Sequence, residues 1–231
     1  MEVNYFSVKG SRKENEDYIL SKHIANDISV HLIADGMGGY ENGRLAAETV
    51  SNRIFEYLNS NIDYEDKNAL INESIVKANN AIRDLTIKSG KTIGSTIGGC
   101  LIIENQASIF WVGDVKIIHV RNNEIQFESE DHSLINQLKK NRNIDNGLDL
   151  GSIRHVVTRS IKGEGNKFSP DVVDIDVAPS DKIIICSDGI LEISRIADIA
   201  KMNFNSETGL ADFKNKYEDN LDNSSLIVVE L

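Results

Sequence analysis

The residues best suited to chemistry lie in the segment from Ile33 to Gly39, where a short apolar run ends in an aspartate and a glycine-rich turn follows. Val30 to Ala34 has the composition of a strand, so Asp35 is expected at a strand end. Glycine lets the backbone approach a bound species closely and adopt conformations that a Cβ forbids. A carboxylate beside exposed main-chain carbonyls suits a hard divalent cation, although an Asp-Gly pair alone is more often an ordinary turn.

Further acidic residues occur in similar settings along the whole chain. They are Glu16 and Asp17 before one short apolar stretch, Asp114 after Ile109–Gly113, Asp188 after Lys182–Ser187, and Asp222 before the last apolar run, Leu226–Val229. Each alone has the properties of a turn or capping residue, but strand ends can converge on one place. Oxygen ligands of this kind select Mg²⁺ or Mn²⁺, and two such ions about 4 Å apart activate a bridging water and clamp the oxygens of an in-line displacement.

Charge counting is consistent with such a site. Glu16, Asp35, Asp188 and Asp222 together carry four negative charges, which two divalent ions would balance. A phosphate dianion would then need a further cation. Arg12 lies four residues before Glu16, and its planar guanidinium suits a phosphoryl group. A plain surface arginine is an equally open interpretation of Arg12.

Several other chemistries do not fit the sequence. The five histidines are scattered without metal-ligand spacing, which argues against a zinc site. The glycine turn lacks the lysine of a P-loop. Cys186 is followed six residues later by Glu192 rather than arginine, which argues against a cysteine-nucleophile phosphatase. Cys100 and Cys186 lie in apolar runs and are expected to be reduced core residues.

Length and composition predict one globular domain spanning residues 1–231, since the chain is 40% hydrophobic and 26% charged. The net charge of -11 disfavours nucleic acid and anionic membranes as partners. No apolar run approaches the roughly 18 residues of a membrane span, and the N-terminus does not have the pattern of a signal peptide. We therefore expect a cytoplasmic monomer that binds neither nucleic acid nor membrane.

Strands around a helical pair must position the acidic residues. Hydrophobic periodicity predicts helices over 43–59, 66–88, 133–140, 193–202 and 208–220, and strands over 3–8, 18–21, 29–34, 96–103, 108–112, 117–121, 125–129, 154–158, 172–177, 182–187 and 225–229. The polar segment from Asn141 to Ser152 is expected to be a loop or short flap. Because the strands surround the helical pair rather than alternate with helices, a β-sandwich with outer helices is predicted.

Eight short segments give these features a family context. In chain order they are 11–17, 34–39, 94–96, 112–114, 130–133, 158–160, 186–189 and Asp222-Asn223. With them the sequence resembles the metal-dependent protein serine/threonine phosphatases of type 2C, the PPM family, in their compact bacterial form. The resemblance implies an α+β fold, a four-layer α-β-β-α sandwich of two antiparallel sheets flanked by helices. It places the metal ions at one end of the sandwich.

The resemblance also implies a role for each site residue. Asp35 would bridge two Mn²⁺ or Mg²⁺ ions, the Gly36 carbonyl would bind one, Asp188 and Asp222 would hold the other, Glu16 would act through metal-bound water, Asp17 would orient waters, Asp114 would help to hold a possible third ion, and Arg12 would grip the substrate phosphate. Phosphoserine and phosphothreonine in proteins, the products of a serine/threonine kinase, would then be hydrolysed by direct attack of a metal-bridging hydroxide.

Three positions depart from the family pattern. Met37 stands where many members carry a histidine proposed as the general acid, so a metal-bound water would have to supply that proton. The motif Gly-Asp-Ser-Arg appears as Gly113-Asp114-Val115-Lys116, which keeps the carboxylate. The Thr158-Arg159 segment continues as Ser160-Ile161-Lys162-Gly163, a looser match for which a structural role is expected.

Two other functions remain open at this point. One is a catalytically inactive phosphatase fold that serves as a binding module, against which the complete acidic set argues. The other is a phosphomonoesterase for small metabolites. Hydrolysis of p-nitrophenyl phosphate and of a phosphothreonine peptide, each with Mn²⁺ and with EDTA, separates the three possibilities.

Overall fold

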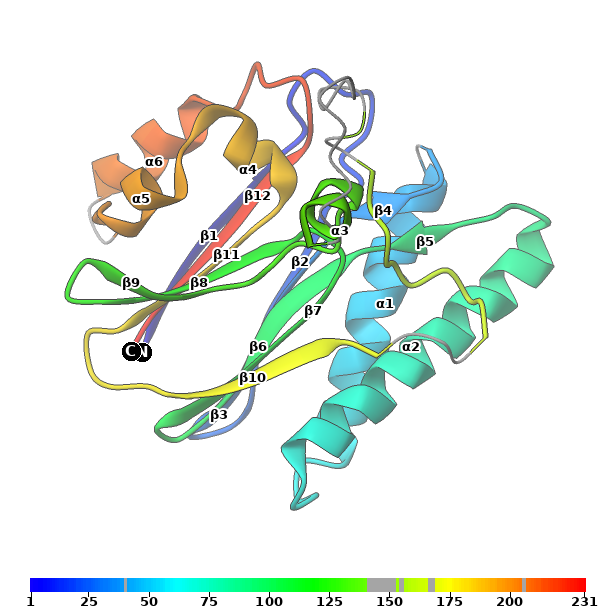
Figure 1. The fold of residues 1–231 in the computed structure, drawn as a ribbon, viewed down its shortest axis with the longest axis horizontal. Helices are drawn as coiled ribbons and strands as arrows, with labels where there is room; N and C mark the ends of the chain where they lie inside the picture. Colours follow the sequence, from blue (N-terminus) through cyan, green and yellow to red (C-terminus); the bar gives the residue numbers. More distant parts are fainter. Residues whose placement is uncertain (40, 141–152, 154–155, 166–168, 205–206) are drawn as a thin grey trace.

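Two five-stranded antiparallel sheets form the centre of the protein (Figure 1). The computed structural model describes residues 1–39, 41–140, 153, 156–165, 169–204 and 207–231. One sheet has the order β1 (Glu2–Val8), β12 (Ser224–Glu230), β11 (Lys182–Cys186), β8 (Lys116–Arg121) and β9 (Glu124–Glu128). The other has the order β10 (Asp171–Asp176), β7 (Gln106–Val112), β6 (Ile97–Ile103), β3 (Ile28–Ala34) and β2 (Tyr18–Ala25). A short ribbon pairs β4 (Gly36–Met37) with β5 (Gly94–Ser95).

Helices cover the outer face of each sheet (Figure 1). The long helices α1 (Glu41–Ser60) and α2 (Lys67–Ser89) pack on the sheet that contains β3. Three short helices, α4 (Asp188–Ile193), α5 (Ile196–Ala200) and α6 (Glu207–Asn215), pack on the sheet that contains β12. Another short helix, α3 (Leu134–Lys140), follows β9. The predicted four-layer α-β-β-α sandwich is therefore confirmed.

Strand alternation creates three hydrophobic layers between the four structural layers. In β3, Val30 and Leu32 face the long helices, whereas Ile33 points into the space between the sheets. In β12, Val228 faces the short helices and Ile227 points between the sheets. Because successive side chains of a strand point to opposite faces, strands that are buried on both faces appear in the sequence as continuous apolar runs.

The long helix α2 shows why its limits could be read from the sequence. Asp66 caps its N-terminus, where the carboxylate accepts a hydrogen bond of 2.9 Å from the backbone N–H of Ala69. Gly90 ends it in the left-handed conformation, with φ at 68°. The helix predicted over 66–88 therefore agrees with the observed limits to within one residue at each end.

Other predicted boundaries were wrong. The helix expected over 193–202 is formed only by α5, Ile196–Ala200, whereas α4, Asp188–Ile193, lies before the predicted range, and Ser194 and Arg195 adopt extended backbone angles between the two. The predicted helix over 208–220 ends at Asn215, and a turn follows it. The predicted strand over 154–158 is not formed by residues 156–158, where Val157 makes one isolated bridge to Ser133.

The flap predicted over 141–152 lies outside the described residues.

Both cysteines are buried and free, as expected of core residues. In the described part of the chain, no helix combines the length and the apolar character needed to cross a bilayer.

Candidate metal centre

The antiparallel register brings the predicted acidic residues to one end of the sandwich. In one sheet, Tyr18 at the start of β2 pairs with Ala34 at the end of β3, so Asp17 and Asp35 are neighbours. In that sheet Ile97 at the start of β6 also pairs with Val112 at the end of β7, just before Asp114. In the other sheet, Cys186 at the end of β11 pairs with Leu226, which places Asp188 and Asp222 near this same end. We call this region the acidic end.

Asp35 is held by its backbone. Its carbonyl oxygen accepts hydrogen bonds of 2.9 Å from both the Thr96 N–H and the Ser95 hydroxyl. The residues that follow, Gly36 and Met37, are extended and pair with β5, whereas a turn had been expected to begin directly after Asp35. These contacts fix the direction in which the Asp35 side chain leaves the strand.

A close approach between two glycines supports Glu16. A Cβ on Gly36 would collide with the Gly43 carbonyl, and a Cβ on Gly43 would collide with the Glu16 carboxylate. The Asn223 side chain fixes the backbone on the other side, because its Oδ1 accepts a 2.8 Å hydrogen bond from the Glu16 N–H. Asn223 also donates to the carbonyl of Lys9 at 2.8 Å and to that of Glu14 at 3.0 Å. Glu16 is therefore positioned by residues that are far apart in the sequence.

Asp17 lies behind the exposed part of the site. Its side chain is buried, with 1% of the residue exposed, and one of its oxygens accepts a 2.9 Å hydrogen bond from the Ser187 hydroxyl. Arg44 donates to the Asp17 backbone carbonyl and its guanidinium lies over the Tyr18 ring. Since Ser187 directly precedes Asp188, this contact connects the two sheets at the acidic end.

Asp114 follows a tightly held turn. Gly113 has φ of 117°, and a Cβ there would collide with Thr96. His132 makes two hydrogen bonds to Gly113. The ring Nδ1 of His132 accepts from the Gly113 N–H at 3.0 Å, and the backbone N–H of His132 donates to the Gly113 carbonyl at 2.8 Å. Lys116, which replaces the family's arginine, is buried and pairs with Asp131 at 2.5 Å.

Arg12 reaches the same region from the loop after β1. Its Nη2 donates to Asp222 Oδ2 at 2.7 Å. The Arg12 side chain is 54% exposed and that of Asp222 is 26% exposed, so both remain accessible to a ligand. The hydrogen bond to Asp222, with the charges of Glu16 and Asp35, raises the pKa of Arg12.

Burial and nearby negative charges raise the pKa values of four carboxyl groups at the acidic end. Burial, with the charges of Asp17, Asp188 and Asp114 among others, raises the pKa of Asp35 well above its ordinary range. Burial raises the pKa of Asp17 to about 7 and that of Asp114 to about 7, and the charge of Asp188 adds to both shifts. Burial also raises the pKa of Glu16. Such a cluster of unneutralised acids favours a bound cation.

The residues present fit divalent ions. Glu16 Oε1 and Asp17 Oδ1 are buried and have no hydrogen-bond partner among the described residues. The potential ligands are all oxygen atoms, which suits Mg²⁺ or Mn²⁺. No three acidic, histidine or cysteine side chains in the described ranges form a ligand cage by themselves. Water and backbone carbonyls would therefore complete the coordination, as is usual for Mg²⁺.

Sequence reasoning missed the residues that support this site. Gly43, Arg44 and His132 had no assigned role, and Asn223 was noted only as part of a motif. Their contacts join segments far apart in the chain, so spacing gave no signal for Gly43 or Arg44. For His132 and Asn223, their places inside the quoted family motifs were the available signal.

Comparison with known proteins identifies the family. The family model described as Protein phosphatase 2C matches residues 9–227. The chain therefore belongs to the protein phosphatase 2C family and is a protein serine/threonine phosphatase, a class of metal-dependent enzymes that act on phosphoproteins.

Individual relatives agree with this assignment. Protein phosphatase PhpP of Streptococcus pneumoniae is 27% identical over 209 residues, which are 86% of this chain and 84% of that protein. A serine/threonine phosphatase structure from S. agalactiae has a TM-score of 0.85 and 26% identity, and the match covers 100% of this chain and 99% of that one. The catalytic domain of phosphatase PstP, solved with two manganese ions, has the same fold with a TM-score of 0.79 at 20% identity, over 99% of this chain and 97% of that one.

Proposed function

We propose that this enzyme hydrolyses phosphoserine and phosphothreonine in proteins at the acidic end, with two Mn²⁺ or Mg²⁺ ions. The observation that carries the proposal is the convergence of Asp17, Asp35, Asp114, Asp188 and Asp222 at one end of the sandwich, where burial and the neighbouring charges raise the pKa values of the first three. The PstP catalytic domain, which has this fold, was solved with two manganese ions.

Each acidic residue has a proposed task. Asp35 would hold both ions, the Gly36 carbonyl would hold one, and Asp188 and Asp222 would hold the other. Glu16 would act through water, Asp17 behind it would orient water and ligands, and Asp114 would help to hold a third ion. When bound, the pair of ions supplies a hydroxide nucleophile at neutral pH and neutralises charge on the phosphate.

Arg12 binds the substrate phosphate. Its side chain is 54% exposed and its guanidinium adjoins Asp222, so it can meet an incoming phosphate from the solvent side. A planar fork of donors matches two phosphate oxygens at once. The Met37 thioether cannot donate a proton, so the leaving alkoxide takes its proton from water.

The surroundings of the enzyme belong to the same proposal. The net charge of -11 disfavours nucleic acid and anionic membrane as partners. We infer a cytoplasmic monomer whose substrates are products of a serine/threonine kinase.

The deciding experiment measures hydrolysis of p-nitrophenyl phosphate and of a phosphothreonine peptide. Both activities should disappear with EDTA and return with Mn²⁺ or Mg²⁺ but not with tightly bound Zn²⁺. Full activity after exhaustive chelation would contradict the mechanism. No activity under any metal condition would favour an inactive binding module, and hydrolysis of small esters alone would favour a metabolite phosphatase.

A further inference from the structure

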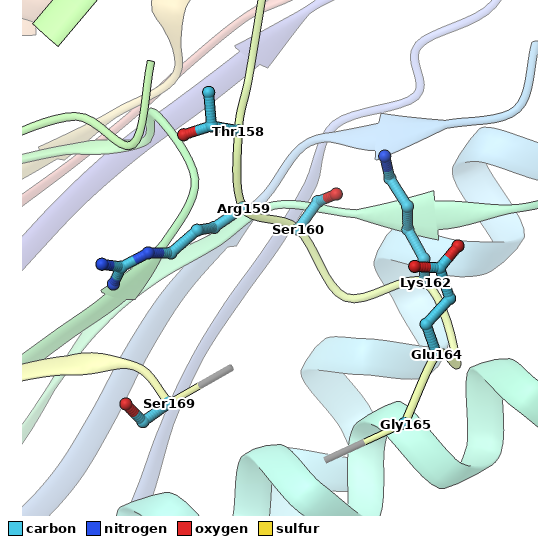
Figure 2. A pocket seen from close by; sticks show the side chains of 7 residues that line it. All are labelled: Thr158, Arg159, Ser160, Lys162, Glu164, Gly165 and Ser169. Atoms are coloured by element: carbon cyan, nitrogen blue, oxygen red, sulfur yellow. The ribbon is translucent and has the colours of Figure 1, made fainter. Parts of the chain in front are cut away.

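A pocket of about 590 Å³ lies along the segment from Thr158 to Gly165 (Figure 2). Its lining includes the cations Arg159 and Lys162, the hydroxyl groups of Ser160 and Ser169, and one carboxylate, that of Glu164. Most of these groups are hydrogen-bond donors. The pocket is therefore suited to a ligand rich in acceptors, such as an anion.

Ser160 and Lys162 point to the same side of this segment. Ile161 between them is fully buried in the core beneath the long helices, with 0% exposed. Residues i and i+2 of an extended chain share a face, so burial of Ile161 directs its two neighbours outward. In Figure 2 the Ser160 hydroxyl and the Lys162 ammonium extend in the same direction.

Lys162 is available to a ligand, whereas Arg159 is occupied. The Arg159 guanidinium donates to Asp171 at 2.8 Å and lies 3.2 Å from His132 Nε2. Among the described residues, Lys162 has no ion pair or hydrogen bond, and Glu164 does not pair with it. The half-buried Lys162 stem passes close to Gly94, where a Cβ would lie 2.9 Å from its Cγ.

The backbone below the pocket is fixed on both sides. Ser95 and Ile161 exchange hydrogen bonds of 3.0 Å and 2.8 Å. Asn79 of α2 accepts from the Gly163 N–H at 2.8 Å and donates to the Glu164 carbonyl at 2.9 Å. A side chain on such a support loses little backbone freedom when it binds a ligand.

The same hydrogen bonds set the distance between the pocket and the acidic end. Ile161 pairs with Ser95 in β5, and β5 pairs with β4, which directly follows Asp35. Two strand spacings of about 4.8 Å separate the pocket segment from β4. An extended peptide covers this span of roughly 10 Å with about three residues.

We propose that Lys162 and Ser160 form a subsite for an anionic side chain of the phosphoprotein substrate, two to four residues from the phosphate that is removed. The subsite rests on the proposed function, because hydrolysis of that phosphate at the acidic end places the peptide. Aspartate, glutamate or a second phosphorylated residue supplies the required chemistry. The Lys162 ammonium pairs with this anion, and the Ser160 hydroxyl donates to it.

The experiment compares the full-length enzyme on matched phosphothreonine peptides with Mn²⁺. One pair carries Glu or Gln three residues before the phosphothreonine, and a second pair carries them three residues after it. A further peptide carries phosphoserine at the better position. We expect kcat/KM to favour the acidic member of one pair by roughly threefold to tenfold, and this preference to shrink at high salt.

Variants test whether the pocket causes this preference. For each protein, the measured quantity is the ratio of kcat/KM on the acidic peptide to kcat/KM on its neutral partner. Lys162→Ala should bring the ratio close to one, Lys162→Glu should invert it, and Lys162→Arg should keep it. Ser160→Ala should reduce it, and Glu164→Gln should increase it. Lys201→Ala, an equal charge change at an exposed lysine in the other helical layer, should leave it unchanged.

The outcomes separate the subsite from the proposed function. Metal-dependent hydrolysis without any acidic preference, or a preference that survives in Lys162→Glu, would overturn the subsite alone. Absence of metal-dependent hydrolysis of every peptide by the unmodified enzyme would overturn the proposed function, and the subsite with it. A larger ratio for phosphoserine than for glutamate would identify multiply phosphorylated segments as the preferred source of the anion.

Discussion

Strand β11 has an aspartate at each end, and the two ends are built in opposite ways. Asp181, just before β11, is buried and accepts hydrogen bonds from Arg121 at 2.9 and 2.7 Å, from His119 at 2.9 Å and from the Ala178 N–H at 2.9 Å. These donors, Arg121 first, hold the pKa of Asp181 well below its ordinary range. Asp188, just after β11, belongs to the acidic end.

The acidic end gathers carboxylates and leaves some of their oxygens without protein donors, although Asp17 accepts from Ser187 and Asp222 accepts from Arg12. Glu16 and Asp17 each have a buried oxygen with no partner among the described residues, and the pKa values of Asp35 and Asp114 are raised, chiefly by burial. A paired buried acid stabilises a fold, whereas unpaired buried acids destabilise it until a cation arrives. The difference indicates that one end of β11 serves stability and the other serves function.

The largest expected effect is the loss of activity on removing one charge from the acidic end. Asp35→Asn should lower kcat by at least about 10³-fold, because both ions depend on this carboxylate. Steady-state hydrolysis of a phosphothreonine peptide measures the loss. Thermal unfolding of the metal-free variant should show stability equal to or above the wild type, since repulsion is relieved. A near-normal rate with normal metal binding would remove Asp35 from the mechanism.

The other end of β11, where Asp181 is paired with Arg121 and His119, should lose stability rather than activity. Asp181→Asn leaves Arg121 and His119 without their anion and should lower the free energy of unfolding by about 2–4 kcal/mol. Urea unfolding of the metal-free protein measures this change. The kcat of the folded variant should stay close to the wild-type value, and a kcat loss comparable to that of Asp35→Asn would end the distinction between the two ends.

Metal binding should stabilise the folded protein only through the carboxylates of the acidic end. Mn²⁺ at 100 times its dissociation constant should add about 2.7 kcal/mol to the unfolding free energy if the ion binds only the folded chain. The increment should be present in Asp181→Asn and largely lost in Asp35→Asn. Calorimetric unfolding with Mn²⁺ and with EDTA compares the three proteins. An equal increment in all three would place the bound metal elsewhere.

Low pH should remove the stabilisation that Asp181 contributes to the fold. The pKa of Asp181 is lower in the folded protein than in the unfolded chain, so its stabilisation is complete above the unfolded value and is lost as the pH falls through and below about 4. The stability difference between wild type and Asp181→Asn should therefore be largest near neutral pH and shrink in acid. Urea unfolding at a series of pH values tests this, and a constant difference would contradict the pairing.

The sequence predicts the residues of the acidic end better than the partners of Asp181. Asp35, Asp114 and Asp188 follow apolar strands directly, so their positions at strand ends could be predicted from local pattern. The Asp181 network could not, because Arg121 lies 60 residues away and only the pairing of β8 with β11 brings it near. The same reason hid the approach of Gly43 to Glu16. Local pattern predicts strands and helices well, whereas partners across sheets depend on the register.

The division of 188–202 into α4 and α5 shows a second limit. The apolar residues Ile190, Ile199 and Ala200 all contact the same core, which a single helix or two short ones could achieve. Periodicity alone does not choose between them. The extended backbone at Ser194 and Arg195 lets both segments pack on the sheet, and this choice depends on the layer beneath.

The smallest expected effect concerns Arg12, which gives the acidic end a cation, as Arg121 does for Asp181. The Arg12 side chain is 54% exposed and its partner Asp222 is a proposed metal ligand, so the main task of Arg12 should be to bind the substrate phosphate. Arg12→Ala should raise KM for a phosphate ester by roughly tenfold, about 1.4 kcal/mol, with little change in Mn²⁺ affinity. Arg12→Lys should recover part of the loss, because an ammonium cannot make the two-pronged contact. If KM stayed constant while Mn²⁺ binding weakened, Arg12 would position Asp222 rather than hold phosphate, and the two ends of β11 would both use arginine to fix an aspartate.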